Sequence, residues 1–175
     1  MDVGLIAAGS KIRPFKIVDD DCFAVTVPKG KQPDPAMVLV ATGHRLNVDN
    51  RVVMAMPGQG MEMSGLVEVF FFRTMLFLTN PGLEGFYRER QLRPDPYSHM
   101  AVLQEYPQLT YECSTATIWP RGNGVYDHLT FVMGGGSWNR PTIPSEARVA
   151  CGQCCGFHDE GQWFAGVSDQ RMLIM

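Results

Sequence analysis

The residues best suited to chemistry lie in one short segment of the second half of the chain. Cysteines stand at positions 151, 154 and 155, and His158 follows three residues later. Two thiolates three residues apart can bind one metal ion from a tight turn, which makes Cys151 and Cys154 candidate zinc ligands and His158 a third. Cys113 is the candidate for the fourth position. The chain contains no second Cys-x-x-Cys pair, so the segment supplies only half of a zinc motif.

A strand through the same segment would arrange these side chains differently. Side chains alternate between the two faces of a strand, so Cys151 and Cys155 would share one face while Cys154 and His158 shared the other. Cys151 and Cys154 could then not bind the same ion. Free cysteines are among the most buried residues in proteins, and we expect these thiols to be structural. Thioredoxin-like chemistry needs the pair to open a helix, which the glycines of this segment disfavour.

The other candidate groups form no complete catalytic set. His128 follows Asp127 in a predicted strand, so the two side chains point in opposite directions and cannot form an Asp–His pair. His44 and His99 are isolated, and such histidines usually lie at the surface or hydrogen-bonded in the core. The Gly-rich stretch 133–138 carries no phosphate-binding or nucleophile motif. We therefore assign no catalytic and no cofactor-binding residue.

The charge of the chain argues against a nucleic-acid or membrane partner. Fifteen basic and eighteen acidic residues give a formal net charge of −3, which provides no broad attraction to polyanions. Arg88, Arg90 and Arg93 form one basic cluster that would suit a phosphate or RNA. Cations near the end of a helix also stabilise its dipole, and Glu84 and Glu89 are available as helical partners. We favour this structural interpretation.

Length and composition indicate one domain over residues 1–175. A chain of 175 residues with 18 Gly and 12 Pro suits many short elements joined by turns. Five cysteines cannot all pair, which favours a reducing compartment, the cytoplasm or a virion. The start of the sequence lacks the pattern of a secretory signal. The longest apolar run, 66–78, contains Glu68 and Arg73 and is too short to span a membrane.

Hydrophobic periodicity and turn residues predict a chain rich in β-strands. The predicted strands are 22–27, 36–42, 51–56, 65–79, 111–119, 125–133, 147–158 and 163–174. The run 65–79 also tolerates a helix, but its aromatic and β-branched residues favour a strand buried on both faces. We expect hairpins between 36–42 and 51–56, around the turn 120–124, and between the last two strands.

Helical spacing is confined to 83–93 and 96–105. Asp95 suits the N-cap of the second helix, and Pro96 suits its first position. The fold class expected from these elements is mainly β, an antiparallel sandwich or barrel with a small helical insert around residues 83–105.

These features favour a non-enzymatic structural or assembly subunit. Such a subunit would bind copies of itself or other subunits through strand edges and chain ends. The eleven methionines would suit an adaptable contact surface. Components of virus or phage particles, from the tail, the neck or a capsid-associated layer, are small β-rich subunits of this kind.

Two alternatives belong to other classes of protein. One is a small zinc- or thiol-dependent enzyme or metal-binding module that uses Cys151, Cys154 and His158. The other is a small-molecule-binding β-barrel, which needs a pocket among His128, Trp119 and Trp163.

Overall fold

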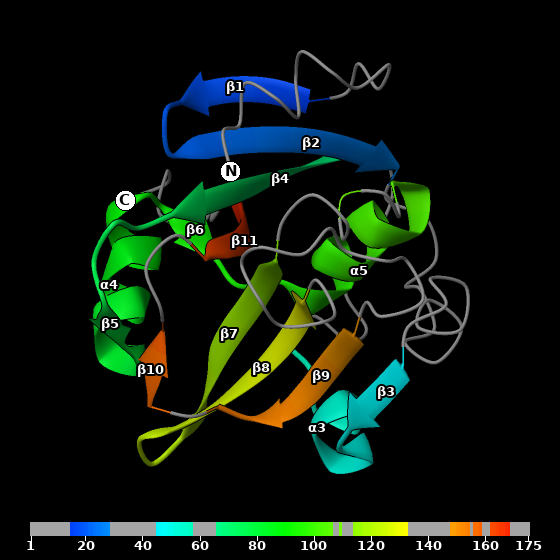
Figure 1. Cartoon of the computed structure of the whole chain (residues 1–175), viewed down its shortest axis with the longest axis vertical. Coiled ribbons are helices and arrows are strands. Elements are labelled where there is room, and N and C mark those ends of the chain that lie inside the picture. Colours follow the sequence, from blue (N-terminus) through cyan, green and yellow to red (C-terminus); the bar gives the residue numbers. More distant parts are fainter. Residues whose placement is uncertain are drawn as a thin grey trace, which may run out of the picture.

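The computed structural model describes residues 15–28, 45–57, 66–106, 109, 114–132, 148–154, 156–158 and 162–168. Its strands are β1 (Phe15–Asp19), β2 (Cys22–Pro28), β3 (Arg45–Val48), β4 (Leu66–Arg73), β5 (Leu78–Thr79), β6 (Leu92–Arg93), β7 (Thr115–Gly122), β8 (Val125–Val132), β9 (Arg148–Gln153), β10 (Phe157–His158) and β11 (Trp163–Ser168). Its helices are α3 (Asn50–Met54), α4 (Asn80–Glu89) and α5 (Pro96–Glu105) (Figure 1).

One mixed sheet organises the described part of the chain. Its strands follow the order β1-β2-β4-β11-β7-β8-β9-β3, with β6 paired to β11. The pairs β11–β7 and β3–β9 are parallel, and the other pairs are antiparallel. The sheet twists strongly, so β2 and β4 cross the direction of β7 and β8 in Figure 1. The predicted mainly β class with a helical insert is confirmed, although the sheet is mixed.

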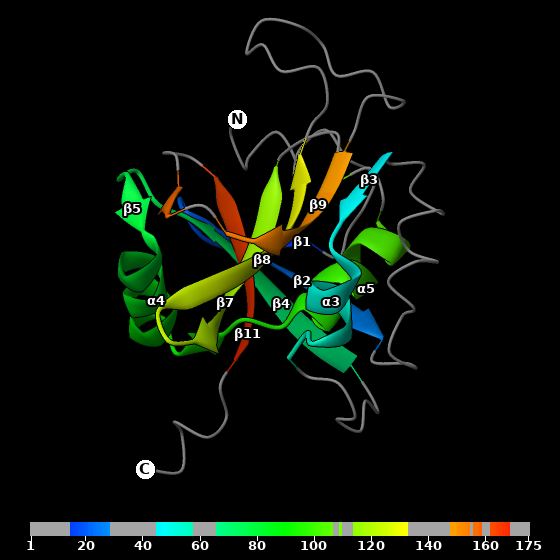
Figure 2. The same ribbon diagram turned by 90° about the horizontal axis from the view of Figure 1, so that it is seen from below.

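The helices cover opposite faces of this sheet (Figure 2). On the α5 side, side chains from α3 and α5 pack against the sheet in one large core. The central residues of this core are Phe23, Phe71, Met100, Leu103 and Phe131. On the α4 side, a smaller core contains Phe72, Leu83, Tyr87, Ile118 and Phe164. Neighbouring residues of β4 enter different cores, which explains why its sequence is apolar at almost every position.

Local capping fixes where the two longer helices begin. The Asp95 carboxylate accepts a hydrogen bond from the Ser98 N–H at 3.1 Å, so α5 begins at Pro96 as predicted. Helix α4 begins at Asn80, three residues before the predicted start. The Thr79 hydroxyl accepts a hydrogen bond from the Gly82 N–H at 3.3 Å. The Asn-Pro-Gly sequence that resembles a turn is therefore the capped first turn of the helix.

The hairpin predicted around 120–124 is confirmed. Strands β7 and β8 pair antiparallel. Asn123 and Gly124 at the turn have φ angles of 55° and 73°. Both lie in the left-handed region that an Asn-Gly hairpin turn requires, because its backbone twist matches that of the flanking strands.

Two predicted elements are wrong. Residues 51–56 do not form a strand, because the Asp49 carboxylate accepts from the Arg51 N–H at 2.9 Å and caps α3 instead. Val52 and Met56, four residues apart, are then both buried in the α5-side core. The last two strands do not form a hairpin either: β9 pairs with β8 and β3, whereas β11 lies between β4 and β7. The predicted strand 36–42 lies outside the described residues, and its predicted hairpin with 51–56 is wrong because the second segment begins within α3.

Candidate functional site

The predicted cysteine ligands separate onto opposite sides of the sheet. Cys151 lies in β9 and is buried in the α5-side core. Cys154, just beyond the end of β9, packs against the α4-side core. Burial raises the pKa of the Cys151 thiol to about 12, so this thiol remains protonated at neutral pH. Cys113 lies outside the described residues, and of the three predicted zinc ligands that the structure describes it brings together Cys154 and His158.

A third residue, Asn80, joins Cys154 and His158. The Asn80 Oδ1 atom lies 2.5 Å from the His158 Nε2 atom and 3.5 Å from the Cys154 sulfur. The distance between the sulfur and Nε2 is 3.9 Å. Asn80 and His158 are buried, with 8% and 5% of their surfaces exposed, and Cys154 is half-buried. A thiol, an imidazole and a carboxamide therefore meet at one place.

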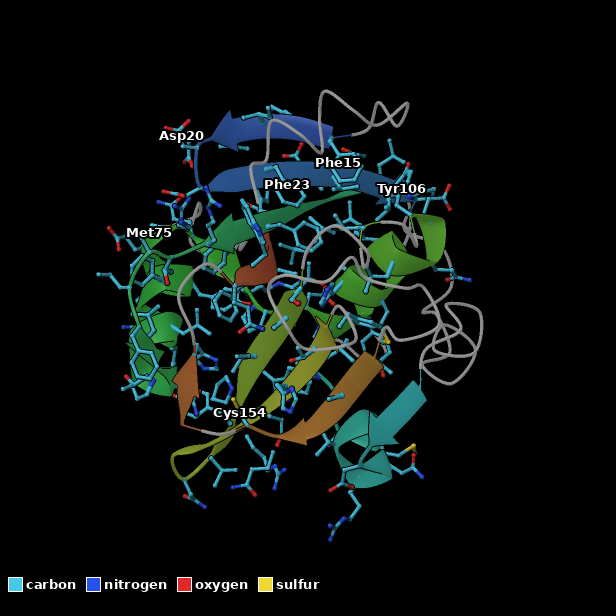
Figure 3. All side chains as sticks on the ribbon, viewed as in Figure 1. Phe15, Asp20, Phe23, Met75, Tyr106 and Cys154 are labelled. Atoms are coloured by element: carbon cyan, nitrogen blue, oxygen red, sulfur yellow. The ribbon has the colours of Figure 1, made fainter. Side chains whose placement is uncertain are left out.

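Three backbone elements position this cluster. Asn80 is the first residue of α4, directly after β5. Strand β10 pairs with β5, with His158 opposite Leu78, which brings the histidine beside the start of the helix. The Cys154 N–H donates a hydrogen bond to the Tyr126 carbonyl oxygen at 2.8 Å. Figure 3 shows Cys154 between β9 and β10.

A pocket of about 190 Å³ lies next to the cluster, between α4 and the β7–β8 hairpin. Asn80 forms part of its wall, and so does Tyr126, whose carbonyl oxygen binds the Cys154 backbone. The Tyr126 hydroxyl donates a hydrogen bond to the Glu84 carboxylate at 2.5 Å. The other lining residues are mainly apolar or aromatic, including Leu83, Tyr87, Leu92, Pro94, Ile118 and Pro120. A small, mainly apolar ligand group would fit this pocket.

Sequence reasoning named Cys154 and His158 but missed Asn80. The asparagine lies 74 residues before the cysteine in the sequence. The two residues come close together in space because β5 pairs with β10. No short-range signal in the sequence could have identified it. Among the described residues, no group of three or more His, Cys, Asp or Glu side chains is arranged to bind a metal ion.

His99 is a core residue. Its Nε2 atom lies 2.8 Å from the Thr115 hydroxyl, and its Nδ1 atom lies 2.9 Å from the Thr117 hydroxyl. Burial lowers the pKa of the imidazole to about 3, so the ring is neutral at physiological pH. This histidine links α5 to β7.

The residues of the predicted barrel pocket do not share one cavity. Trp119 and Trp163 are buried in the α5-side core. His128 follows Asp127 and precedes Leu129 in β8, and the Leu129 side chain lies in the α5-side core, so His128 points to the other face. The His128 Nδ1 atom is 2.7 Å from the Thr130 hydroxyl, and burial lowers the pKa of this ring.

The three clustered arginines each face a carboxylate of this chain. Arg88 pairs with Glu84 at 3.8 Å, within α4. Arg90 pairs with Asp19 at 3.6 Å, and Arg93 pairs with Asp95 at 3.5 Å. These contacts agree with the structural interpretation of the cluster.

An exposed apolar loop connects β4 to β5. Met75, Leu76 and Phe77 are consecutive, and 62%, 61% and 58% of their respective surfaces are exposed. The preceding residue, Thr74, is buried and donates a hydrogen bond from its hydroxyl to the Leu76 carbonyl oxygen at 2.9 Å. A run of exposed apolar residues in a folded protein usually serves a function, most often binding.

Compared with known proteins, the chain matches no protein-family model, no curated protein sequence and no solved structure. Its function is therefore inferred from its own residues and their geometry. Within the described part of the chain, no helix has both the length and the apolar character needed to cross a membrane.

Proposed function

We propose that this protein is a non-enzymatic assembly subunit that binds a second copy of itself through the loop Met75–Phe77. The exposure of three consecutive apolar side chains in this loop carries the proposal. Leaving such a run in water is unfavourable, whereas burying it against another subunit is favourable by roughly 25 cal/mol per Å² of apolar surface.

The anchoring of the loop supports a role in binding. The Thr74 hydroxyl holds the Leu76 carbonyl oxygen, and Arg73 fixes the preceding strand end. The Arg73 guanidinium donates a hydrogen bond to the Asp21 carboxylate at 3.0 Å and lies 5.0 Å from the centre of the Trp163 ring. A loop held in one shape loses little conformational entropy on association, so more of the burial energy appears as affinity.

The surface around the loop extends the proposed contact. The ion pair between Arg73 and Asp21 joins the loop to the β1–β2 turn, and Figure 3 shows Asp20 and Met75 on the same side of the molecule. Strand β1, next to this turn, ends the sheet in the described part of the chain. In this strand, 51% of the surface of Ile17 and 46% of the surface of Val18 are exposed. An apolar loop beside a sheet edge suits an interface between subunits.

Closed homo-oligomers are the commonest assemblies of soluble proteins, which is why we name a second copy as the partner. Small β-rich subunits of this kind occur in virus and phage particles, in a tail, neck or capsid-associated position. This is the setting we propose for the assembly, on its class alone.

Native mass spectrometry and sedimentation velocity test the proposal. We expect a defined multiple of 19.5 kDa for the wild-type chain and a monomer for the double variant Leu76→Asp/Phe77→Asp. Met54→Asp is the matched control: Met54 is 72% exposed on α3, away from the loop, and its replacement should leave the oligomer intact. A wild-type monomer at all concentrations, or an oligomer that the double variant does not dissociate, would overturn the proposal.

A further inference from the structure

The cluster of Cys154, His158 and Asn80 has no role in the proposed assembly, and it resembles a chemical site more than a packing contact. A half-buried thiol faces a buried imidazole at 3.9 Å, and a buried carboxamide oxygen contacts both groups. Nucleophilic cysteines in acyl-transfer enzymes combine these three functional groups. The pairing of β5 with β10 and the first turn of α4 position these groups.

The other described cysteines provide a contrast within the same molecule. Burial raises the pKa of the Cys22 thiol to about 11 and that of the Cys151 thiol to about 12. Both side chains are almost completely enclosed, at 3% and 2% exposure. Cys154 is the described cysteine that combines partial exposure with a neighbouring imidazole. A thiolate is stabilised by such a neighbour when the imidazole is protonated.

We propose that Cys154 is a nucleophilic residue that accepts an acyl group from an ester or thioester whose apolar acyl chain lies in the pocket beside α4. Asn80 and Tyr126 connect this pocket to the cysteine. Leu83, Leu92 and Ile118 supply apolar surface for an acyl chain of a few carbons.

The reaction conserves atoms and needs no oxidant or other co-reactant. The Cys154 thiol loses its proton to water, and the Nε2–H group of His158 stabilises the resulting thiolate. The sulfur then attacks the carbonyl carbon of the acyl donor. The bond from that carbon to the alcohol or thiol leaving group breaks, and the leaving group takes a proton from water. The products are a thioester at Cys154 and a free alcohol or thiol.

Asn80 is a positioning residue in this scheme. The Nε2–H group of His158 donates a hydrogen bond to the Asn80 Oδ1 atom at 2.5 Å, and the Cys154 sulfur lies 3.9 Å from the same nitrogen. The ring also packs edge-on against Phe164, with the ring centres 5.5 Å apart. These two contacts fix the plane of the imidazole, so that its Nε2–H group stays near the thiolate.

The test uses p-nitrophenyl hexanoate as the acyl donor and the full chain carrying Cys155→Ser, so that the labelled cysteine is unambiguous. We expect one nitrophenolate released and one hexanoyl group added per chain, located at Cys154 by peptide mass spectrometry. His158→Gln should slow this acylation at neutral pH by about 10-fold, the effect of raising the pKa of the attacking thiol by about one unit. Cys154→Ser should abolish it. Cys22→Ser, on the same core, is the matched control and should leave it unchanged.

A structural role for His158 would not change the pH dependence, so the pH profile of acylation separates the two roles. We expect the wild-type rate to reach half its maximum at a lower pH than the rate of the His158→Gln variant. Should that variant fail to fold, the wild-type chain in urea serves as the comparison, because unfolding removes the imidazole from the thiol. Acylation of native Cys154 no faster than in the unfolded chain, or a rate and pH profile unaffected by His158→Gln, would overturn the proposal.

Discussion

His99 shows how a single buried residue can make stability depend on pH. Its ring lies between two threonine hydroxyls and packs edge-on against Phe71 and Phe131, with ring centres 5.7 Å and 5.2 Å away. Each ring nitrogen has a hydroxyl partner, so the neutral imidazole is satisfied in the core. A charged imidazole would lose far more hydration than these two hydroxyls replace.

We expect the free energy of unfolding to fall as the pH falls from about 6.5 to about 3. The pKa of His99 is about 3 in the folded protein and near its ordinary 6.5 in the unfolded chain. Between these values the unfolded chain binds a proton that the folded protein does not, so acid favours unfolding by up to roughly 1.4 kcal/mol per pH unit. Urea unfolding at a series of pH values measures this slope.

Carboxylates also contribute to the fall in unfolding free energy at acidic pH, so the comparison must isolate the contribution of His99. His99→Asn removes the titrating group, and the difference in unfolding free energy between wild type and variant should shrink as the pH falls below 6.5. A difference that stayed constant between pH 7 and pH 4 would contradict the assignment of this pH dependence to His99.

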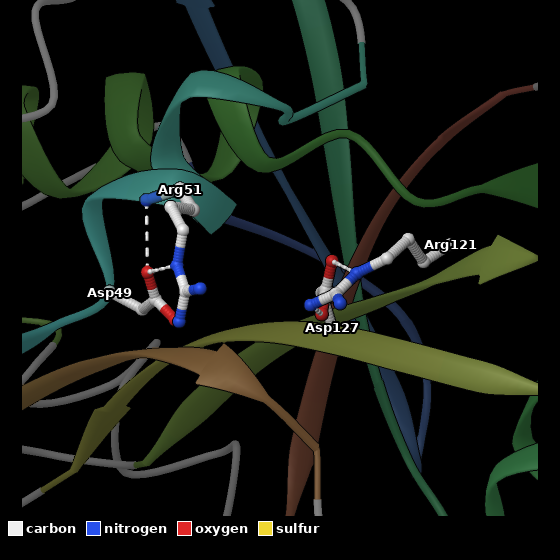
Figure 4. Close-up of polar contacts among 4 residues, drawn as sticks. All are labelled: Asp49, Arg51, Arg121 and Asp127. Carbon is white, nitrogen blue, oxygen red and sulfur yellow. Dashed lines mark hydrogen bonds and ion pairs between the residues drawn. The ribbon is translucent and has the colours of Figure 1, made fainter.

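Two arginine–aspartate pairs illustrate how burial decides what an ion pair contributes (Figure 4). Asp127 is 1% exposed, and the Arg121 guanidinium binds both of its carboxylate oxygens. Asp49 and Arg51 form a similar contact at the surface, where the Arg51 side chain is 92% exposed. Removing the partner of a buried carboxylate leaves its desolvation uncompensated, whereas removing an exposed partner lets water replace it.

We therefore expect Arg121→Met to destabilise the protein and Arg51→Met to have little effect. A buried acceptor that loses its donor typically costs on the order of 1–3 kcal/mol, and this cost falls on Asp127. Thermal unfolding of both variants beside the wild type measures the difference. Equal melting temperatures for the two variants would show that Asp127 reaches water in the absence of Arg121.

At the scale of elements, we expect glycine-to-alanine substitutions at two positions to have opposite effects on stability. A Cβ added at Gly85, inside α4, would meet no atom within 4 Å. A Cβ added at Gly166, in β11, would lie 2.9 Å from the Tyr87 ring and 3.2 Å from Leu92. The Tyr87 hydroxyl donates a hydrogen bond to the Ala165 carbonyl oxygen at 2.7 Å, so α4 cannot move away freely.

Gly85→Ala should stabilise the protein by about 0.5–1 kcal/mol, because alanine loses less backbone entropy than glycine in a helix. Gly166→Ala should destabilise it by roughly 1–3 kcal/mol, the usual cost of forcing extra volume into a packed interior. Denaturant unfolding of both variants measures the two values. Two changes of the same sign would show that the packing of α4 on β11 is looser than these distances imply.

The sequence correctly predicted those elements that depend on a few adjacent residues. It failed for elements whose structure depends on contacts between distant parts of the chain. Asp95-Pro96 marks the start of α5, and Asn123-Gly124 marks a hairpin, because capping and turn geometry depend on a few adjacent residues. Residues 51–56 read as a strand from their valines, yet the Asp49 cap and burial against α5 make α3 a helix. Tertiary packing overrides β-propensity in so short a segment.

The candidate site was half predictable for the same reason. Cys154 and His158 lie four residues apart, and alternation along a strand suggested that they share a face. Asn80 joins them through the pairing of β5 with β10, a contact between segments 78 residues apart. The sequence contains no periodicity that could reveal such a contact.

At the scale of the whole molecule, the large sheet links the two cores. Phe71 and Phe72 are adjacent in β4, yet Phe71 packs in the α5-side core and Phe72 in the α4-side core. Strand β11 divides its residues in the same way, with Ala165 on the α5 side and Phe164 on the α4 side. Neither core can lose its packing without disturbing the strands that support the other.

We therefore expect the described fold to unfold as one cooperative unit. Phe71→Leu and Phe72→Leu each remove an aromatic ring from one core, at a cost on the order of 1–2 kcal/mol. Trp119 and Trp163, on the α5 side, are two of the three tryptophans of the chain. Both variants should lower the unfolding free energy by the same amount whether it is measured from tryptophan fluorescence in denaturant or from hydrogen exchange of the α4 amides. If Phe72→Leu instead accelerated exchange in α4 while the tryptophan transition stayed in place, the α4 side would be a separate unit that opens on its own. Coincident shifts would mean that damage to either core weakens both candidate sites, because the loop Met75–Phe77 follows β4 and leads through β5 to Asn80.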